Sequence, residues 1–210
     1  MSVKPGAFQG QYPPRWHSII NSPVGRLYVA ASDNALTGIW YEEQAHFPLP
    51  HELGERITDP AGLVAEADEV AQAIGADAER SGEHIYVAPA RILAQTEREL
   101  DEYFRGRRTD FEVPLDPDGT DFQLAVWDYL KTVPYGYTVT YGEISRVVGP
   151  GAPAQAVGQA VGHNKISIII PCHRVLGAGG KLTGYAGGLD RKRWLLDREE
   201  PKDIRSGRLF

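Results

Sequence analysis

The sequence predicts an α/β protein of the α+β kind, with an N-terminal antiparallel-sheet domain that also carries helices and a C-terminal, mostly helical domain. Short strand-like runs separated by turn residues fill the start of the chain, whereas helical periodicity dominates its second half. Between them, residues 111–120 hold two prolines, a glycine and three acidic residues, which is the composition of a linker. We therefore predict a flexible arm over 1–15, a support domain over 16–116 and a second domain over 117–210.

Three strands are expected in the N-terminal domain, because β-branched and aromatic residues cluster there in runs bounded by turn residues. Their spacing predicts an antiparallel meander over Trp16–Asn21, Arg26–Ala31 and Ala35–Tyr41. Residues 42–59 are polar and interrupted by proline, so we expect a loop there. Apolar residues at helical spacing, each series stopped by a glycine, predict two amphipathic helices, one from Pro60 to the residue before Gly75 and one over about Ile92–Phe104.

Two capping boxes mark helix starts in the C-terminal domain, Thr120 with Gln123 and Thr140 with Glu143. A Gly-Pro-Gly turn over 149–151 separates the second of these helices from a third. Helix, tight turn and helix form the helix-turn-helix arrangement that enters a DNA groove, although most short helix pairs only pack in cores, so the pattern alone is a weak indication. The predicted helices cover Phe122–Lys131, a short stretch to about Val148, and about Pro153–Val161.

The apolar run Ile166–Ile170 predicts a short buried strand that leads directly to Cys172, the only cysteine of the chain. Six glycines follow between Gly177 and Gly188. A last helix is expected over about Asp190–Glu199.

Composition excludes several classes of protein. A single cysteine rules out an internal disulfide and a zinc site built on cysteine pairs. The first residues lack the apolar core of a signal peptide, and no run approaches the roughly 20 apolar residues that span a bilayer. We therefore expect a soluble protein in the reducing cytoplasm, with no membrane partner.

The net charge of −6 hides an asymmetry between the two halves. Residues 1–115 carry 10 basic and 18 acidic side chains, whereas the chain from Phe122 onward carries 12 basic and 7 acidic ones. The acidic balance thus belongs to the first domain, and the basic second half is compatible with a partner that bears phosphate. Its modest excess of positive charge predicts salt-sensitive binding of limited strength.

Cys172 has two interpretations. Free cysteines are usually buried and act as small hydrophobic residues. Here Pro171 fixes the chain, His173 and Arg174 supply polarity that favours a thiolate, and the glycine-rich stretch lets backbone approach a ligand. A direct Cys-His dyad is disfavoured because neighbours on an extended chain point to opposite sides. We expect any help from His173 to pass through a water molecule.

Ordered segments around this cysteine resemble a known family. The segment from Pro171 to Val175 is similar to the active-site signature of the O6-alkylguanine-DNA alkyltransferases, also called methylated-DNA–protein-cysteine methyltransferases. The resemblance covers about Phe122–Glu199, and the preceding region, with its early strands and the EYFRGRRTDFEVPLD stretch, resembles the family's more variable N-terminal domain. The matching segments are FQLAVWDYL, VPYG, TYGEI, the AVG of the third helix, GHN, IIIPCHRV, LTGYAGG and KRWLL.

The resemblance implies a protein that repairs DNA by direct reversal and acts once. A damaged guanine is flipped out of duplex DNA, because its O6 substituent is out of reach while the base is stacked. The alkyl group then passes irreversibly from O6 to Cys172. On this resemblance His173 is the base that acts through water, Glu199 orients His173, and Tyr141 donates a proton toward guanine N3.

The same resemblance assigns substrate-binding and DNA-binding residues. Asn164 is the hinge between the helix-turn-helix and the segment that carries the cysteine. Gln155 stands where family members usually have an arginine that fills the gap left by the flipped base, so we expect weaker DNA binding. Gly162 stands where some relatives carry a basic residue. The flipped base is expected to meet Tyr185, Ala186, Gly187, Gly188, Val175 and Pro171, and DNA is expected to meet Gln155, Ala154, Ala156, Thr140, Gly158 and Arg174.

No cofactor and no metal are expected. Some family members bind zinc through N-terminal cysteines, which this chain lacks. The expected partner is double-stranded DNA that contains O6-alkylguanine, bound by a protein that is monomeric in solution and able to line up in several copies along DNA.

Two alternatives of other classes stay open. A damage sensor built on the same fold would bind the lesion without reacting, although it would not need a nucleophile at Cys172. A cysteine hydrolase unrelated to DNA would need a base that faces the thiol and an oxyanion site, and it would turn over repeatedly. The range of alkyl groups accepted and any activity on O4-alkylthymine are not determined by the sequence.

Overall fold

The computed structural model describes residues 15–74, 86–149 and 151–200, and the predicted arm lies outside these ranges except for Arg15. The N-terminal half contains the expected meander of β1 (Trp16–Ser22), β2 (Gly25–Ala31) and β3 (Leu36–Tyr41), paired antiparallel. The prediction of three strands is confirmed.

The expected loop over 42–59 contains two short elements that the sequence did not reveal. Helix α1 (Pro50–Leu53) is followed by β4 (Glu55–Arg56), which pairs parallel to β1 and completes a sheet of order β3-β2-β1-β4. The sheet is therefore mixed rather than purely antiparallel. With two residues, β4 is too short to show a period-2 pattern, so only its pairing identifies it.

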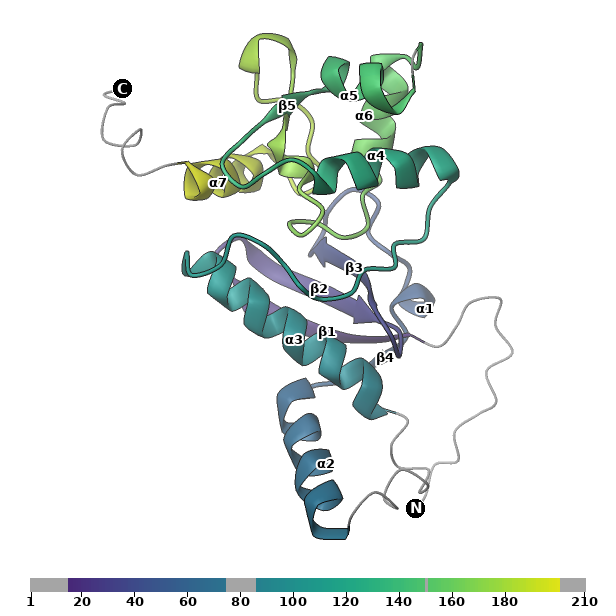
Figure 1. Ribbon diagram of the computed structural model, residues 1–210, viewed down its shortest axis with the longest axis vertical. Coiled ribbons are helices and arrows are strands. Elements are labelled where there is room, and N and C mark those ends of the chain that lie inside the picture. The colour runs from purple at the N-terminus through teal and green to yellow at the C-terminus, as the bar shows by residue number, and fades with distance from the viewer. Residues whose placement is uncertain (1–14, 75–85, 150, 201–210) are drawn as a thin grey trace.

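Helix α3 (Val87–Phe104) lies along one face of the N-terminal sheet, and α2 (Pro60–Ile74) packs against α3 on the side away from the C-terminal half (Figure 1). Helix α2 has the predicted bounds. Helix α3 packs against β1 and β2 and begins five residues before the predicted start. Its buried face includes Leu93 and Leu100, which are fully buried and fall at the helical spacing that predicted it.

The C-terminal half begins with α4 (Asp121–Lys131), and α5 (Tyr141–Val148) and α6 (Ala154–Gly162) form the expected helix-turn-helix. Both capping boxes are present, because each threonine side chain accepts from the backbone three residues on and the facing Gln or Glu reaches back. In Figure 1 these helices and α7 (Leu189–Glu199) lie on the far side of the sheet from α2.

The predicted strand over Ile166–Ile170 is wrong, although its burial was predicted correctly. These residues form turns, and only Ile166 makes an isolated bridge, to Ile39. Ile168 has a φ of 74°, a left-handed conformation that strains a β-branched residue and reverses the chain. The short strand lies after the cysteine instead: β6 (Val175–Leu176) pairs parallel to β5 (Val139–Thr140).

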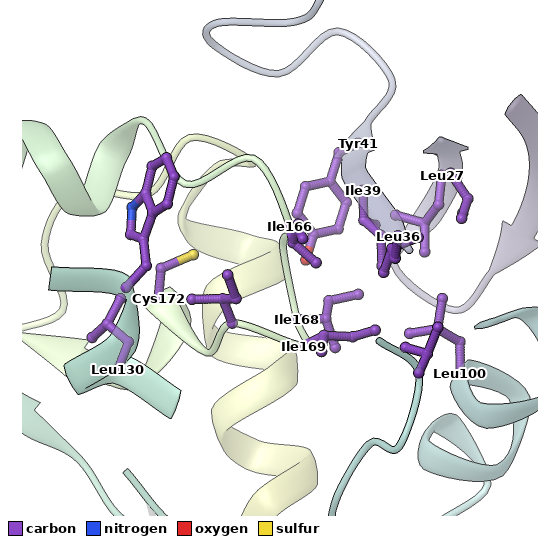
Figure 2. Close-up of a cluster of buried hydrophobic side chains, with 14 of the residues drawn as sticks. Leu27, Leu36, Ile39, Tyr41, Leu100, Leu130, Ile166, Ile168, Ile169 and Cys172 are labelled. Atoms are coloured by element: carbon purple, nitrogen blue, oxygen red, sulfur yellow. The ribbon is translucent and has the colours of Figure 1, made fainter. Parts of the chain in front are cut away.

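One hydrophobic core runs through both halves of the protein. Figure 2 shows Ile39 and Tyr41 of the sheet facing Ile166 and Ile168 of the turn segment. Backbone bonds join the same segments, since Ile39 donates to the Lys165 carbonyl at 2.8 Å and accepts from Ser167 at 3.1 Å. The sheet thus holds the turn that leads to Cys172. No helix within the described ranges is long and apolar enough to cross a membrane.

Candidate active site

Cys172 begins a single turn of 3-10 helix, Cys172–Arg174, directly after the buried turn segment. Its side chain is 5% exposed. Neighbours in a 3-10 turn do not alternate as they do on an extended chain, so the premise by which we disfavoured a direct Cys-His dyad is wrong. Within the described part of the chain, the hydrogen bonds of His173 and Cys172 nevertheless go to other partners.

Asn164 organises the segment before the cysteine. Its amide nitrogen donates to the Cys172 sulfur at 3.1 Å and to the Ile170 carbonyl at 2.8 Å. Its carbonyl oxygen accepts from the Ile166 backbone at 3.0 Å. Asn164 follows His163, the C-cap of α6, so it lies between the helix-turn-helix and the segment that leads to the thiol.

Three neighbours act on the ionisation of the thiol. Burial raises the pKa of Cys172, because a thiolate loses hydration inside the protein. The Asn164 amide, the Lys192 ammonium and the Tyr185 hydroxyl each pull that pKa back down. The raised pKa leaves the thiol mostly protonated at neutral pH, so a transfer reaction would need a base to remove its proton.

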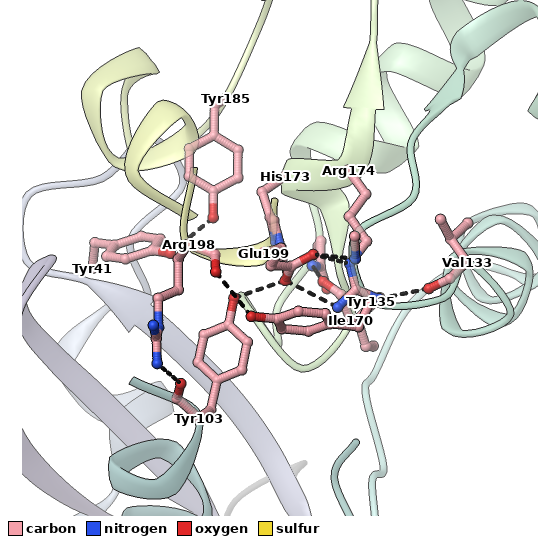
Figure 3. A network of polar contacts seen from close by, with 12 residues as sticks. Tyr41, Tyr103, Val133, Tyr135, Ile170, His173, Arg174, Tyr185, Arg198 and Glu199 are labelled. Carbon is pink, nitrogen blue, oxygen red and sulfur yellow. Dashed lines mark hydrogen bonds and ion pairs between the residues drawn. The ribbon is translucent and has the colours of Figure 1, made fainter. Parts of the chain in front are cut away.

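His173 is arranged as such a base (Figure 3). It is fully buried, and its Nε2 lies 2.8 Å from Oε1 of Glu199. Burial lowers the pKa of His173, so the ring is neutral at pH 7. Because a carboxylate only accepts, Nε2 carries the proton and donates it. The lone pair therefore sits on Nδ1, which is buried without a hydrogen-bond partner among the described protein atoms.

Glu199 is held by several donors from both halves of the protein. Arg174 donates two hydrogen bonds to this carboxylate, from Nε to Oε2 at 2.8 Å and from Nη2 to Oε1 at 3.0 Å. The Tyr103 hydroxyl of α3 donates to Oε1 at 2.8 Å, and the Gly136 backbone donates to Oε2 at 3.3 Å. Burial alone would raise the pKa of Glu199, but His173 and Arg174 outweigh it and hold the pKa well below its ordinary value.

Arg174 was expected to contact DNA, and the structure contradicts this. Its side chain is buried, pairs with Glu199 and donates to the Val133 carbonyl. It also lies 5.9 Å from the centre of the Tyr135 ring. A planar guanidinium suits this bidentate pairing, which keeps its charge away from solvent and phosphate.

Lys192 is a site residue that sequence reasoning missed. Its fully buried ammonium donates to the carbonyls of Val175, Thr183 and Gly184 at 2.5, 2.6 and 3.1 Å. Burial lowers its pKa to about 8, although negative charge on Cys172 would raise it. The lysine of the KRWLL segment thus fixes the glycine-rich loop beside the thiol. A lysine on the apolar side of a predicted helix was the available signal.

Tyr141 reaches the same site from the start of α5. Its hydroxyl lies beside Gly184, where an added Cβ would come within 3.4 Å, and it bonds to the Thr183 side chain. Burial raises its pKa, and negative charge on Cys172 would raise it further, so the hydroxyl stays protonated. The Tyr141 ring packs near Gly158, which places Gly158 behind the tyrosine.

The remaining predicted pocket residues lie in the glycine-rich loop and on either side of the 3-10 turn. The half-buried Tyr185 hydroxyl contacts the Tyr41 hydroxyl at 2.8 Å. Gly187 is buried, and an added Cβ would lie 2.5 Å from the Tyr41 ring, so only glycine fits there. Ala186 accepts a backbone bond from Ala45. Pro171 and Val175 are buried on either side of the 3-10 turn.

The helix-turn-helix presents its expected residues to solvent at the start of α6. Ala154 and Gln155 are exposed and Ala156 is half-buried. Thr140 is half-buried, and both its hydroxyl and its backbone N–H are engaged with the Glu143 carboxylate of its capping box. Thr140 therefore serves as a helix cap in this structure. Within the described ranges, no group of three or more His, Cys, Asp or Glu could hold a metal ion.

Two family descriptions match the chain. "6-O-methylguanine DNA methyltransferase, DNA binding domain" matches residues 121–201, and the "ribonuclease-like domain" of the same family matches residues 63–117. The methylated-DNA–protein-cysteine methyltransferase of Mycobacterium bovis is 40% identical over 183 residues, which is 87% of this chain and 91% of the relative. The chain belongs to the methylated-DNA–protein-cysteine methyltransferases. The resemblance that the sequence indicated is confirmed.

Other members of the family agree in sequence and in fold. The methylated-DNA–protein-cysteine methyltransferase of Methanosarcina acetivorans is 50% identical over 114 residues, 54% of this chain and 73% of that protein. The crystal structure of Mycobacterium tuberculosis OGT in complex with DNA is 38% identical, with a TM-score of 0.68, over 90% of this chain and 97% of that one. This methyltransferase therefore shares its fold over nearly its whole length.

Proposed function

We propose that this methyltransferase repairs duplex DNA by moving an alkyl group from O6 of a flipped guanine to Cys172, once per protein molecule. The observation that supports this most strongly is the set of side chains around the sole cysteine. Asn164 contacts the sulfur, and the buried His173–Glu199 pair leaves a lone pair free at Nδ1. That set can create a thiolate and hold it in one position.

The proposed reaction begins with the proton on sulfur. A water molecule between Cys172 and His173 passes that proton to Nδ1, and Glu199 stabilises the imidazolium that forms. The thiolate then attacks the alkyl carbon, a carbon–sulfur bond forms, and the bond between carbon and guanine O6 breaks. The bonding electrons pass to the guanine, which must be stabilised as it leaves.

Tyr141 is the donor that we assign to the leaving guanine. Its raised pKa keeps the hydroxyl protonated, so it can donate toward N3 as negative charge develops there. After the transfer, the proton on His173 can restore the tyrosine hydroxyl through water. The thioether on Cys172 is stable, which makes the reaction stoichiometric rather than catalytic.

The approach of DNA is assigned to the exposed start of α6 and to the glycine-rich loop. Fewer basic side chains can contact DNA phosphates than the sequence indicated. Arg174 and Lys192 are buried, and Lys165 pairs with Asp118 at 3.0 Å. Arg146 on α5 and Lys181 in the loop are exposed. We therefore propose weak, salt-sensitive binding to duplex DNA.

We further propose that the protein works as a monomer in the cytoplasm. All residues of the proposed reaction come from one chain. A nucleophilic thiol must also stay reduced, and the cytoplasm keeps thiols reduced.

Loss of O6-methylguanine from DNA tests the proposal. A duplex oligonucleotide with one O6-methylguanine is incubated with increasing amounts of protein, and the remaining lesion is measured. We expect repair to stop at one lesion per protein molecule and to be absent in Cys172→Ser. Binding of lesion DNA without repair would favour the damage sensor, and repeated turnover would contradict a suicide reaction.

Restoring an arginine at Gln155 should strengthen binding. We expect Gln155→Arg to raise affinity for lesion DNA about threefold or more at low salt, because arginine adds a charge and stacks better in the gap left by the base. Single-turnover repair rates and binding titrations measure this. Gln159→Arg is the matched control, since it adds the same charge one turn along α6. Equal gains in both variants would show that Gln155 does not occupy the gap.

A further inference from the structure

Tyr41 of the N-terminal sheet lies within the active site that the C-terminal half builds. It is the last residue of β3, and its side chain is fully buried. Its hydroxyl oxygen is 2.8 Å from that of Tyr185, which is 144 residues away in the sequence. Figure 3 shows the two hydroxyl groups pointing toward each other. The Tyr185 hydroxyl is in turn close enough to the Cys172 thiol to lower its pKa.

The direction of these hydrogen bonds follows from chemistry. A thiolate has no proton to give, so it can only accept, and Tyr185 must donate to it. The Tyr185 oxygen is then free to accept, and Tyr41 is the donor placed to reach it. Burial raises the pKa of both tyrosines, so both hydroxyl groups keep the proton that this chain of donors needs.

The surroundings hold Tyr41 in this position. Its backbone N–H donates to Gln44 at 2.9 Å, and the guanidinium of Arg191 lies 4.9 Å from the centre of its ring. Gly187 leaves room for the ring, because an added Cβ would overlap it. The Tyr41 and Tyr185 rings meet edge to face, with centroids 5.9 Å apart. These neighbours together hold the Tyr41 hydroxyl within hydrogen-bond distance of the Tyr185 hydroxyl.

We propose that Tyr41 is a positioning residue for Cys172. The Tyr41 hydroxyl donates its hydrogen to Tyr185 and thereby orients the Tyr185 hydroxyl toward the sulfur. The N-terminal domain then contributes to the reactivity of the nucleophile, beyond supporting the fold. Hydrogen bonds in a chain polarise one another, so the outer donor strengthens the inner one. The Asn164 amide also bonds to the sulfur, and the charges of Lys192 and of a Cys172 thiolate act on each other, as do Tyr141 and that thiolate.

The experiment measures the thiol directly. The full-length protein is treated with iodoacetamide from pH 6 to pH 10, and intact mass gives the rate of modification. Because Cys172 is the only cysteine, an adduct that peptide mapping places on cysteine reports on this sulfur alone. We expect Tyr41→Phe to shift the rate profile to higher pH and to slow modification at pH 7 about fivefold, since losing one hydrogen bond disfavours the thiolate.

Two further variants show whether Tyr41 acts through Tyr185. Tyr86→Phe removes another hydroxyl of the N-terminal domain, one that bonds to Glu55, and should leave the profile unchanged. In a Tyr185→Phe background, Tyr41→Phe should have no additional effect. An unchanged profile in Tyr41→Phe alone, or an equal added shift in the double variant, would overturn the proposal.

The role of Tyr41 in repair rests on the proposed function, because Cys172 is the proposed alkyl acceptor. The iodoacetamide profile involves no DNA. A failure of Tyr41 to move the profile would leave alkyl transfer untouched, and a failure of alkyl transfer would leave the measured profile standing.

Discussion

Glu199→Gln is expected to lower the free energy of unfolding by about 3–5 kcal/mol at pH 7, the usual cost of removing one partner of a buried ion pair. The substitution keeps the shape of the side chain but leaves the buried guanidinium of Arg174 without its counter-charge. It also leaves the Tyr103 hydroxyl facing a neutral amide. Alkyl transfer should slow as well, because a neutral amide stabilises the His173 imidazolium less than a carboxylate does. Urea unfolding and single-turnover repair measure the two effects.

Asp197→Asn is the matched control for this change. Asp197 lies on the same helix, is exposed, and loses the same charge. We expect it to change the free energy of unfolding by less than about 0.5 kcal/mol, as is usual at the surface. Equal losses in the two variants would show that the charge of α7, rather than the buried pair, is responsible.

Lys192→Met is expected to slow alkyl transfer at least about tenfold, a change equivalent to roughly 1.4 kcal/mol. The variant removes the cation that lowers the pKa of Cys172 and releases the carbonyls of Thr183 and Gly184. Stability should change less than activity, because burying the ammonium is itself costly, as its pKa of about 8 indicates. Single-turnover repair across pH measures the effect.

Arg193→Met provides the comparison for Lys192, because Arg193 is the next residue on α7 and is exposed. It should retain the repair rate once DNA is saturating. If Lys192→Met also repaired DNA at the original rate, the lysine would be a structural anchor without influence on the thiol.

Local sequence signals predicted most of the fold. The capping boxes at Thr120 and Thr140 define helix starts through bonds only three residues long, so they can be read from the sequence. The strand predicted over Ile166–Ile170 was wrong because an apolar run indicates that residues are buried but does not determine their backbone conformation. The positive φ of Ile168 depends on the Asn164 bonds and on the sheet edge at Ile39, which are set by tertiary structure.

The site was predicted less completely, and the reason is distance along the chain. The resemblance placed Cys172, His173 and Glu199 together, and the structure joins His173 to Glu199 by a hydrogen bond in the turn that Cys172 begins. Tyr103 contacts Glu199 across 96 residues, and no local pattern marks such a contact. Arg174 was misassigned because the sequence shows that a charge exists but not that Glu199 holds it inside the protein.

The most direct test of the account is the intact mass of the protein after incubation with excess DNA that contains O6-methylguanine. We predict that each molecule gains the mass of one methyl group, that peptide mapping places it on Cys172, and that Cys172→Ser gains none. A protein of unchanged mass that has nonetheless removed the lesion, or a methyl group found on another residue, would contradict the account.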